Sequence, residues 1–203
     1  MAIAEVLEVI SNVNIVINAV TAIVNGIKTF VEVVIDAAKA IGIIKSDVNA
    51  ETLGTQSLQA KDSGIEFGAE GFDTYKATFD EVSNVTIDTE KSNNYSPEDK
   101  LRAAGELVTG VLIESHPGIE KILKLATSGD SISSFFTPAR IAEYIKSDVN
   151  FTNVAAYLKG TMVSDDMISQ TADELKHVEK NISPELSEQE ISRITDEQFG
   201  SVN

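Results

Sequence analysis

The sequence predicts an all-α protein, in which a long apolar N-terminal helix or helical hairpin precedes a domain of several short helices. Two observations support this prediction. Residues 4–44 contain no proline, and their polar residues recur every seven positions, which is a helical period. Further along the chain, a capping residue is followed by proline at 96–97, 137–138 and 183–184, a pattern typical of helix starts.

The N-terminal segment carries more apolar surface than a helix at the surface of a globular protein needs. Its most regular row of polar residues consists of Ser11, Asn18, Asn25, Glu32 and Lys39. As one helix, residues 4–44 would be about 60 Å long, which exceeds the width of a compact domain of this size. Another surface must therefore cover this segment.

Three coverings of the N-terminal segment remain open. It can fold back near Asn25 and Gly26 into a hairpin buried by the rest of the chain, pack against copies of itself, or enter a membrane. Residues 9–27 carry no charge over the length of a membrane span, but their four asparagines are costly in lipid. Asparagine in an apolar seam instead fixes the register of associating helices, so we favour an interface between copies. The predicted interface comprises Val13, Ile17, Asn18, Val20, Val24, Asn25, Ile27, Val31 and Val34.

We expect three regions along the chain. Residues 1–48 form an apolar helical segment for oligomerisation or the core, residues 49–71 a glycine-containing acidic connection, and residues 72–203 an acidic helical domain. Glycines at 64, 68 and 71 argue against continuous structure in the connection. Residues 50–99 contain eleven acidic and three basic side chains, and residues 160–203 contain ten and three, so these stretches are expected to face solvent.

In the third region, apolar residues recur at helical spacing between turns and caps. A short helix is expected over 72–82, a brief extended segment over 84–88 and an exposed loop over 88–94. The next helix begins at Ser96-Pro97 and ends at His116-Pro117. Further helices are predicted from the apolar residues of 119–126, 141–145, 151–158, 168–182 and 191–199, the last opened by a capping box of Ser187 and Glu190.

One hexapeptide occurs twice. Residues 44–49 read Ile-Lys-Ser-Asp-Val-Asn, and residues 145–150 repeat them without change. Both copies lie where a helix is expected to end, so each is interpreted as a helix terminus, with its lysine toward the negative helix end and Ser-Asp capping the next element. Twin docking elements are the alternative interpretation.

The sequence offers little catalytic chemistry, and we expect no catalytic, cofactor-binding or metal site. There is no cysteine, and His116 and His177 lie in no recognisable nucleophile or metal motif. The carboxylates of Asp62, Glu66, Glu70 and Asp73 are clustered, but their spacing does not match a calcium loop. The protein is therefore expected not to be an enzyme.

Net charge limits the partners. With 32 acidic and 16 basic side chains the formal charge is −16, which disfavours nucleic acid. The start of the chain lacks the basic region of a secretion signal, so we expect a cytoplasmic protein or part of a particle assembled inside the cell.

These observations favour a non-enzymatic structural or assembly protein that self-associates through its N-terminal helix, as in a phage or injection-type bacterial assembly. Its expected partners are further copies of itself or other proteins of the assembly. The first alternative is a membrane-active helical protein. The four asparagines make it less favoured than the assembly protein. The second alternative is an acidic module that binds a basic protein partner.

Overall fold

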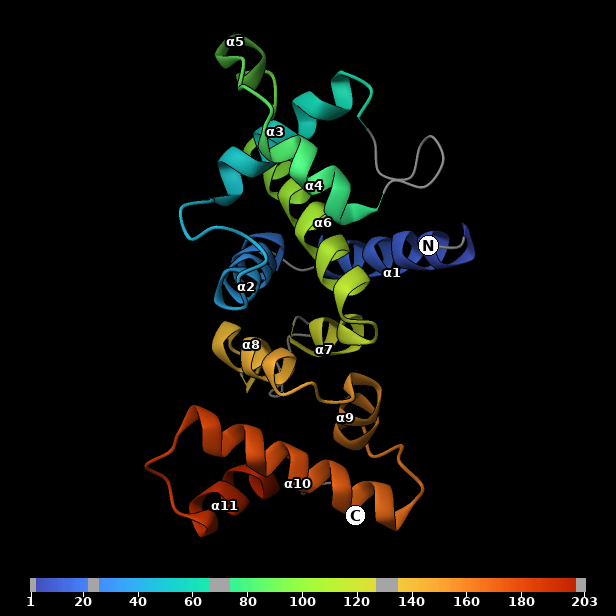
Figure 1. Ribbon diagram of the computed structural model, residues 1–203, viewed down its shortest axis with the longest axis vertical. Helices are drawn as coiled ribbons and strands as arrows, with labels where there is room; N and C mark the ends of the chain where they lie inside the picture. Colours follow the sequence, from blue (N-terminus) through green and yellow to red (C-terminus); the bar gives the residue numbers. More distant parts are fainter. Residues whose placement is uncertain (1–2, 22–25, 66–73, 127–134, 200–203) are drawn as a thin grey trace. The chain divides into compact units, whose positions relative to one another are not determined.

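The computed structural model describes residues 3–21, 26–65, 74–126 and 135–199. Within these residues the protein is all-helical, as the sequence predicts, with eleven helices and no strand (Figure 1). The chain divides into two compact units, residues 1–120 and 121–203. The first unit contains α1 (Ile3–Thr21), α2 (Gly26–Ala40), α3 (Ala50–Asp62), α4 (Tyr75–Ser83), α5 (Thr89–Ser92) and α6 (Pro97–Ser115). Helix α7 (Ile119–Ala126) begins at the end of the first unit, and the second contains α8 (Pro138–Lys146), α9 (Phe151–Leu158), α10 (Asp165–Ile182) and α11 (Glu188–Phe199).

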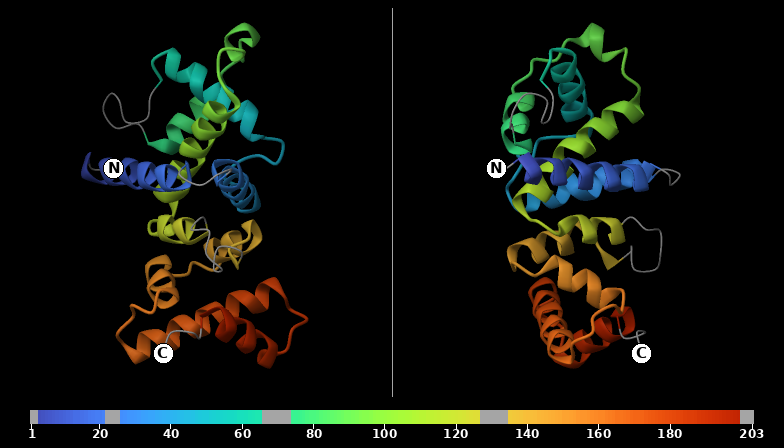
Figure 2. Two further views of the ribbon diagram at one scale, coloured as in Figure 1. Left: turned by 180° about the vertical axis from the view of Figure 1, so that it is seen from behind. Right: turned by 90° about the vertical axis from the view of Figure 1, so that its right-hand side faces the viewer.

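Helix α6 is the central element of the first unit. It contacts α1, α2, α3 and α4, and α1 and α2 also lie side by side (Figure 2). Its apolar side chains Ala104, Val108, Val111 and Leu112 are all buried. This face therefore forms the core against which the other helices pack.

A close backbone approach joins α3 to α6. A Cβ atom added at Gly54 would lie only 1.9 Å from the carbonyl oxygen of Lys100. Only a residue without a side chain allows the two helices to cross at this distance. Residues 50–62 therefore form a packed helix in the first part of the segment expected to be a glycine-containing connection.

A single long apolar helix over residues 4–44 is not seen. Helix α1 ends at Thr21, α2 begins at Gly26, and residues 22–25 lie outside the described part of the chain. Helix α2 ends at Ala40 because Gly42, with φ of +76°, lets the amide of Ile43 donate to the carbonyl of Ala38 at 2.9 Å. None of the helices that the structure describes combines the length and the apolar character needed to cross a membrane.

In the second unit, α10 contacts α8, α9 and α11. Its buried face contains Thr171, Leu175 and Val178, together with the carboxylate of Glu179. Glu179 pairs with Arg140 of α8 through two bonds of 2.8 Å, from Nε to Oε1 and from Nη2 to Oε2. A buried bidentate ion pair thus fixes α8 against α10.

Two of the three cap-proline pairs begin helices as predicted, but Ser183-Pro184 does not, because Ser183 ends α10 and α11 begins only at Glu188. Ser96 and Asp99 form a capping box at α6, and Ser187 and Glu190 form another at the start of α11. Thr137 caps α8, whose first residue is Pro138. These starts are local features, so they are predictable without the tertiary structure.

The repeated hexapeptide is a helix cap, but the capping residue differs from the one predicted. Asn49 accepts a hydrogen bond from the amide of Thr52 at 2.8 Å, and Asn150 accepts one from Asn153 at 3.0 Å. The two copies therefore cap α3 and α9 through their last residue and not through Ser-Asp.

The segment over 84–94 differs from the prediction. Residues 89–92 form the short helix α5, capped by Asp88, where an exposed loop was expected. No strand pairs with residues 85–88 in the described part of the chain. Instead, the side-chain amides of Gln56 and Gln59 form hydrogen bonds with the backbone of Val85 and Asp88. For example, the Gln59 Nε2 donates to the carbonyl of Asp88 at 2.7 Å. Side chains of α3 thus replace the strand partner that an extended segment needs.

Candidate functional site

Four residues of the predicted interface lie in the core of the first unit. Val13, Ile17, Val31 and Val34 are each at most 1% exposed. A Cβ added at Gly105 of α6 would lie 2.8 Å from Val31 and 3.4 Å from Ile17, so these side chains pack against α6. A second copy of the chain reaches them only if this core opens.

The other predicted interface residues have different environments. Asn18 is exposed, and its Oδ1 accepts a hydrogen bond of 3.2 Å from Arg102 of α6. Ile27 is partly exposed. Val20 belongs to α1, but its side chain is not among those that the structure describes. Val24 and Asn25 lie outside the described residues. Self-association through this set of residues stays a prediction.

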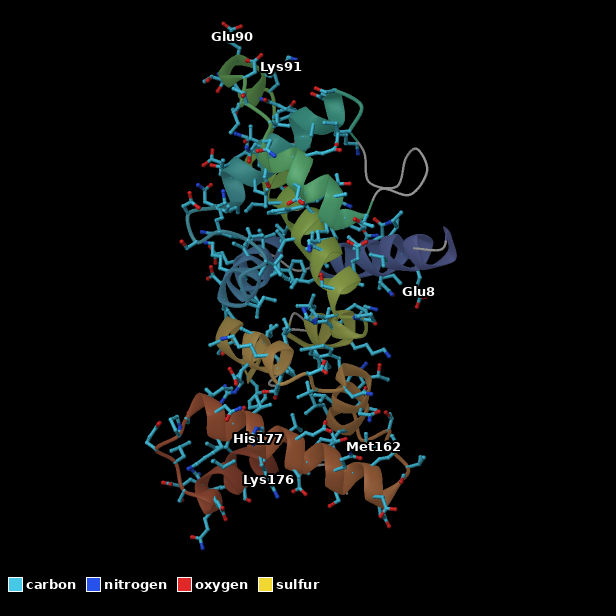
Figure 3. The ribbon with its side chains drawn as sticks, in the orientation of Figure 1. Glu8, Glu90, Lys91, Met162, Lys176 and His177 are labelled. Carbon is cyan, nitrogen blue, oxygen red and sulfur yellow. The ribbon has the colours of Figure 1, made fainter. Side chains whose placement is uncertain are left out.

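Of the carboxylates and histidines singled out in the sequence, the structure describes Asp62, His116 and His177. Asp62 accepts a hydrogen bond from the hydroxyl of Tyr95 at 2.5 Å, whereas Glu66, Glu70 and Asp73 lie outside the described residues. His116 ends α6, and its backbone amide donates to Leu112 at 2.8 Å. His177 lies on the exposed side of α10 (Figure 3). Among the residues described, no three carboxylate or histidine side chains are arranged to hold a metal ion.

The cavity of greatest chemical interest lies in the first unit, between the N-terminal half of α1, the end of α6 and the start of α7. We call it the acidic cavity, and its volume is about 420 Å³. Three carboxylates line it, those of Glu8, Glu114 and Glu120, each from a different helix. The sequence predicted none of them as a site.

The remaining walls of the acidic cavity are apolar or uncharged. Val9 and Asn12 of α1 face Ile113 of α6 across it, and the Pro117-Gly118 turn closes one side. Gly118 has a φ of +94°, which a residue with a side chain rarely adopts. This tight turn places α7 directly after α6, so that Glu120 lines the same cavity as Glu114.

The three carboxylates differ in exposure and in hydrogen bonding. Glu8 is exposed on α1 (Figure 3), and Glu114 is partly buried and accepts a 3.0 Å bond from the amide of Lys76. Glu120 is only 7% exposed, and its Oε2 has no hydrogen-bond partner among the residues that the structure describes. None of the three belongs to an ion pair within this described part.

The negative field in this part of the first unit is visible at Tyr75. Burial raises the pKa of its hydroxyl, and the carboxylates of Glu106 and Glu114 raise it further. Tyr75 lies against Gly110 of α6, one turn before Glu114. The carboxylates of Glu106 and Glu114 thus place negative charge along the last turns of α6.

A weak signal for the acidic cavity is present in the sequence. Ile119, Ile122 and Leu123 form the apolar face of α7, and Glu120 is next to that face in a helical projection. Its burial therefore follows from the helix register. The approach of α1, which supplies Glu8 and Asn12, depends on tertiary packing and leaves no local pattern.

A second polar cavity lies in the second unit. It has a volume of about 590 Å³ and lies between α10 and the second copy of the repeated hexapeptide, which contributes Ser147 and Val149. Asp166, Asp173 and Glu174 of α10 line it together with His177. This cavity is open, and of these four side chains only Glu174 is partly buried, with no partner for its Oε2 among the described residues, so this cavity is the weaker candidate.

The chain matches no protein-family model, and no curated protein or solved structure is significantly similar to it.

Proposed function

We propose that the chain is a non-enzymatic helical assembly protein that binds a basic partner protein through its acidic surface. The observation that carries this proposal is the surplus of unpaired carboxylates, three of which line one cavity. Such a surface attracts positively charged segments and repels nucleic acid.

The distribution of charge supports this choice. The chain has 32 acidic side chains, and six ion pairs occur in its described part. Most carboxylates there have no paired cation. Because isolated surface charges repel one another, a basic partner relieves repulsion that the folded chain bears alone.

The packing of the N-terminal helices favours a partner other than a second copy of the chain. Val13, Ile17, Val31 and Val34, the most apolar part of the predicted interface, fill the core around α6. Their burial satisfies the apolar surface that prompted the prediction of self-association. This leaves the charged surface as the feature that still lacks a counterpart.

The proposal is tested by fluorescence anisotropy with a labelled peptide that alternates lysine and alanine. A peptide of the same length that alternates glutamate and alanine is the matched control. We expect saturable binding of the lysine peptide alone, weakening as salt rises from about 50 to about 200 mM. Equal binding of both peptides, or no binding of either, would contradict the proposal.

A further inference from the structure

Glu120 is a buried carboxylate without a partner. It is 7% exposed, and its Oε2 accepts no hydrogen bond from the described residues. An ionised carboxylate in such a position is costly unless a cation or donor reaches it. Its place in the first turn of α7 offsets part of this cost through the helix dipole, but supplies no donor to Oε2.

Glu120 is one of the residues that line the acidic cavity. Glu114 and Glu8 line the same space, so a positive group there faces carboxylates from three helices. Helix α6 also ends here, at Ser115, and the negative end of its dipole favours a cation. The negative charge of the three carboxylates, the dipole of α6 and the unpaired Oε2 of Glu120 therefore all favour a positively charged ligand.

The walls of the cavity select the form of that cation. Val9, Ile113 and Pro117 provide an apolar surface, on which a hydrocarbon chain packs well. An ammonium group has three donors pointing in different directions, which suits carboxylates on separate helices better than the flat fork of a guanidinium. The described side chains do not have the arrangement that a metal ion requires.

We propose that the acidic cavity binds one primary alkylammonium group together with its aliphatic chain, as a lysine side chain of a partner presents them. The ammonium lies between Glu120, Glu114 and Glu8, and the methylene groups lie along Val9 and Ile113. This assignment rests on the proposed function, because it names the part of the acidic surface at which the basic partner is recognised.

The test compares two charge-neutralising variants of the full chain, Glu120→Gln and Glu90→Gln. Glu90 is an exposed residue of α5 in the same unit (Figure 3), so both variants remove one negative charge. For the lysine–alanine peptide we expect Glu120→Gln to weaken binding about tenfold, equal to about 1.4 kcal/mol. Glu90→Gln should change it by about twofold at most. Equal losses in the two variants would overturn the site and indicate general charge attraction.

Two further variables separate recognition from folding. Glu8→Gln alters an exposed residue at the rim of the cavity, so the fold is retained, and we expect weaker binding than with Glu90→Gln. The same peptide with acetylated lysines keeps the hydrocarbon chains but loses the charges, and we expect it not to bind. Thermal unfolding separates a loss of binding from a loss of folding, and we expect Glu120→Gln to keep the wild-type Tm, because glutamine has nearly the same shape and no hydrogen bond to Oε2 is lost. A lowered Tm together with unchanged peptide binding would assign Glu120 to the fold.

A small diamine distinguishes the source of the ammonium group. If 1,5-diaminopentane displaces the peptide from the wild-type chain but not from Glu120→Gln, the cavity recognises the alkylammonium itself, whatever carries it. If the lysine peptide fails to bind while the diamine shifts NMR signals of residues at the cavity, the proposed function fails and the site stands. If the peptide binds equally to all variants, the site fails and the proposed function stands.

Discussion

At the scale of single residues, buried or hydrogen-bonded polar groups carry most of the measurable consequences. The clearest is the pair of Tyr95 and Asp62, whose 2.5 Å hydrogen bond links the start of the α6 region to the end of α3. This bond is the main cause that raises the pKa of Tyr95 to about 12, and burial adds to it. The hydroxyl therefore keeps its proton well above the usual range.

An absorbance titration of tyrosine checks this effect. The difference between wild type and Tyr95→Phe should show one hydroxyl with a midpoint of about 12, and Asp62→Asn should lower that midpoint toward the ordinary value near 10. Since the folded pKa is raised, the contribution to stability is complete below about pH 10 and is lost as pH rises toward 12. A midpoint near 10 in the wild type would show that the bond is absent in solution.

The buried pair of Arg140 and Glu179 yields a second prediction. Arg140 also donates to the carbonyl of Phe135 at 3.1 Å and lies 4.2 Å from the centre of its ring. The hydrogen bond to Glu179 raises the pKa of Arg140, so its guanidinium stays charged. Arg140→Met leaves Glu179 buried without a counter-ion and should lower the free energy of unfolding by about 3–5 kcal/mol.

The matched control is the double variant Arg140→Met with Glu179→Met, measured by denaturant unfolding of the full chain. It removes both charges, so most of the lost stability should return. Equal stability of the single and double variants would mean that the unpaired charge is not the cause.

At the scale of helices, local sequence predicts starts and ends better than it predicts neighbours. The Ser96-Pro97 start of α6 and the capping box at Ser187 were predictable, because they depend on residues three positions apart. Helix α5 was not predictable, because four residues are too few to show an apolar period. The acidic cavity was missed because Glu8 lies far from Glu114 and Glu120 along the sequence, and the three line one cavity only in the folded chain.

The crossing of α3 and α6 gives a prediction at this scale. Gly54→Ala places a Cβ against backbone at 1.9 Å, where no side chain can move aside, and should cost roughly 3 kcal/mol of unfolding free energy. Gly105→Ala is the control in α6, because its Cβ meets a methyl group of Val31 at 2.8 Å, which can shift. Denaturant unfolding should rank Gly54→Ala as clearly the more damaging. The reverse order would contradict the close approach of α3 to α6.

At the scale of the whole molecule, the apolar N-terminal segment and the acidic surface have separate roles. The sequence showed that residues 4–44 need a cover, but could not decide between the chain itself, a second copy and a membrane. The decision depends on α6, which lies far along the sequence and buries Ile17 and Val31. Long-range packing of this kind leaves no trace in local periodicity.

The mass of the protein in solution tests whether the N-terminal segment is covered by the chain itself or by a second copy. Light scattering on a sizing column, at two protein concentrations and without detergent, should give the monomer mass of 21.8 kDa at both. The physical reason is that Val13, Ile17, Val31 and Val34 are already buried. A defined multimer at both concentrations would restore self-association as the leading function.

Binding of a basic partner at the acidic cavity can be followed residue by residue by NMR spectroscopy. In a titration of isotope-labelled full-length protein with the lysine–alanine peptide, we expect saturable shifts concentrated on the amides of Asn12, Gly118 and Glu120. Those shifts should disappear in Glu120→Gln and persist in Glu90→Gln. Shifts spread evenly over the acidic residues of both units, or centred on the cavity beside His177, would contradict it.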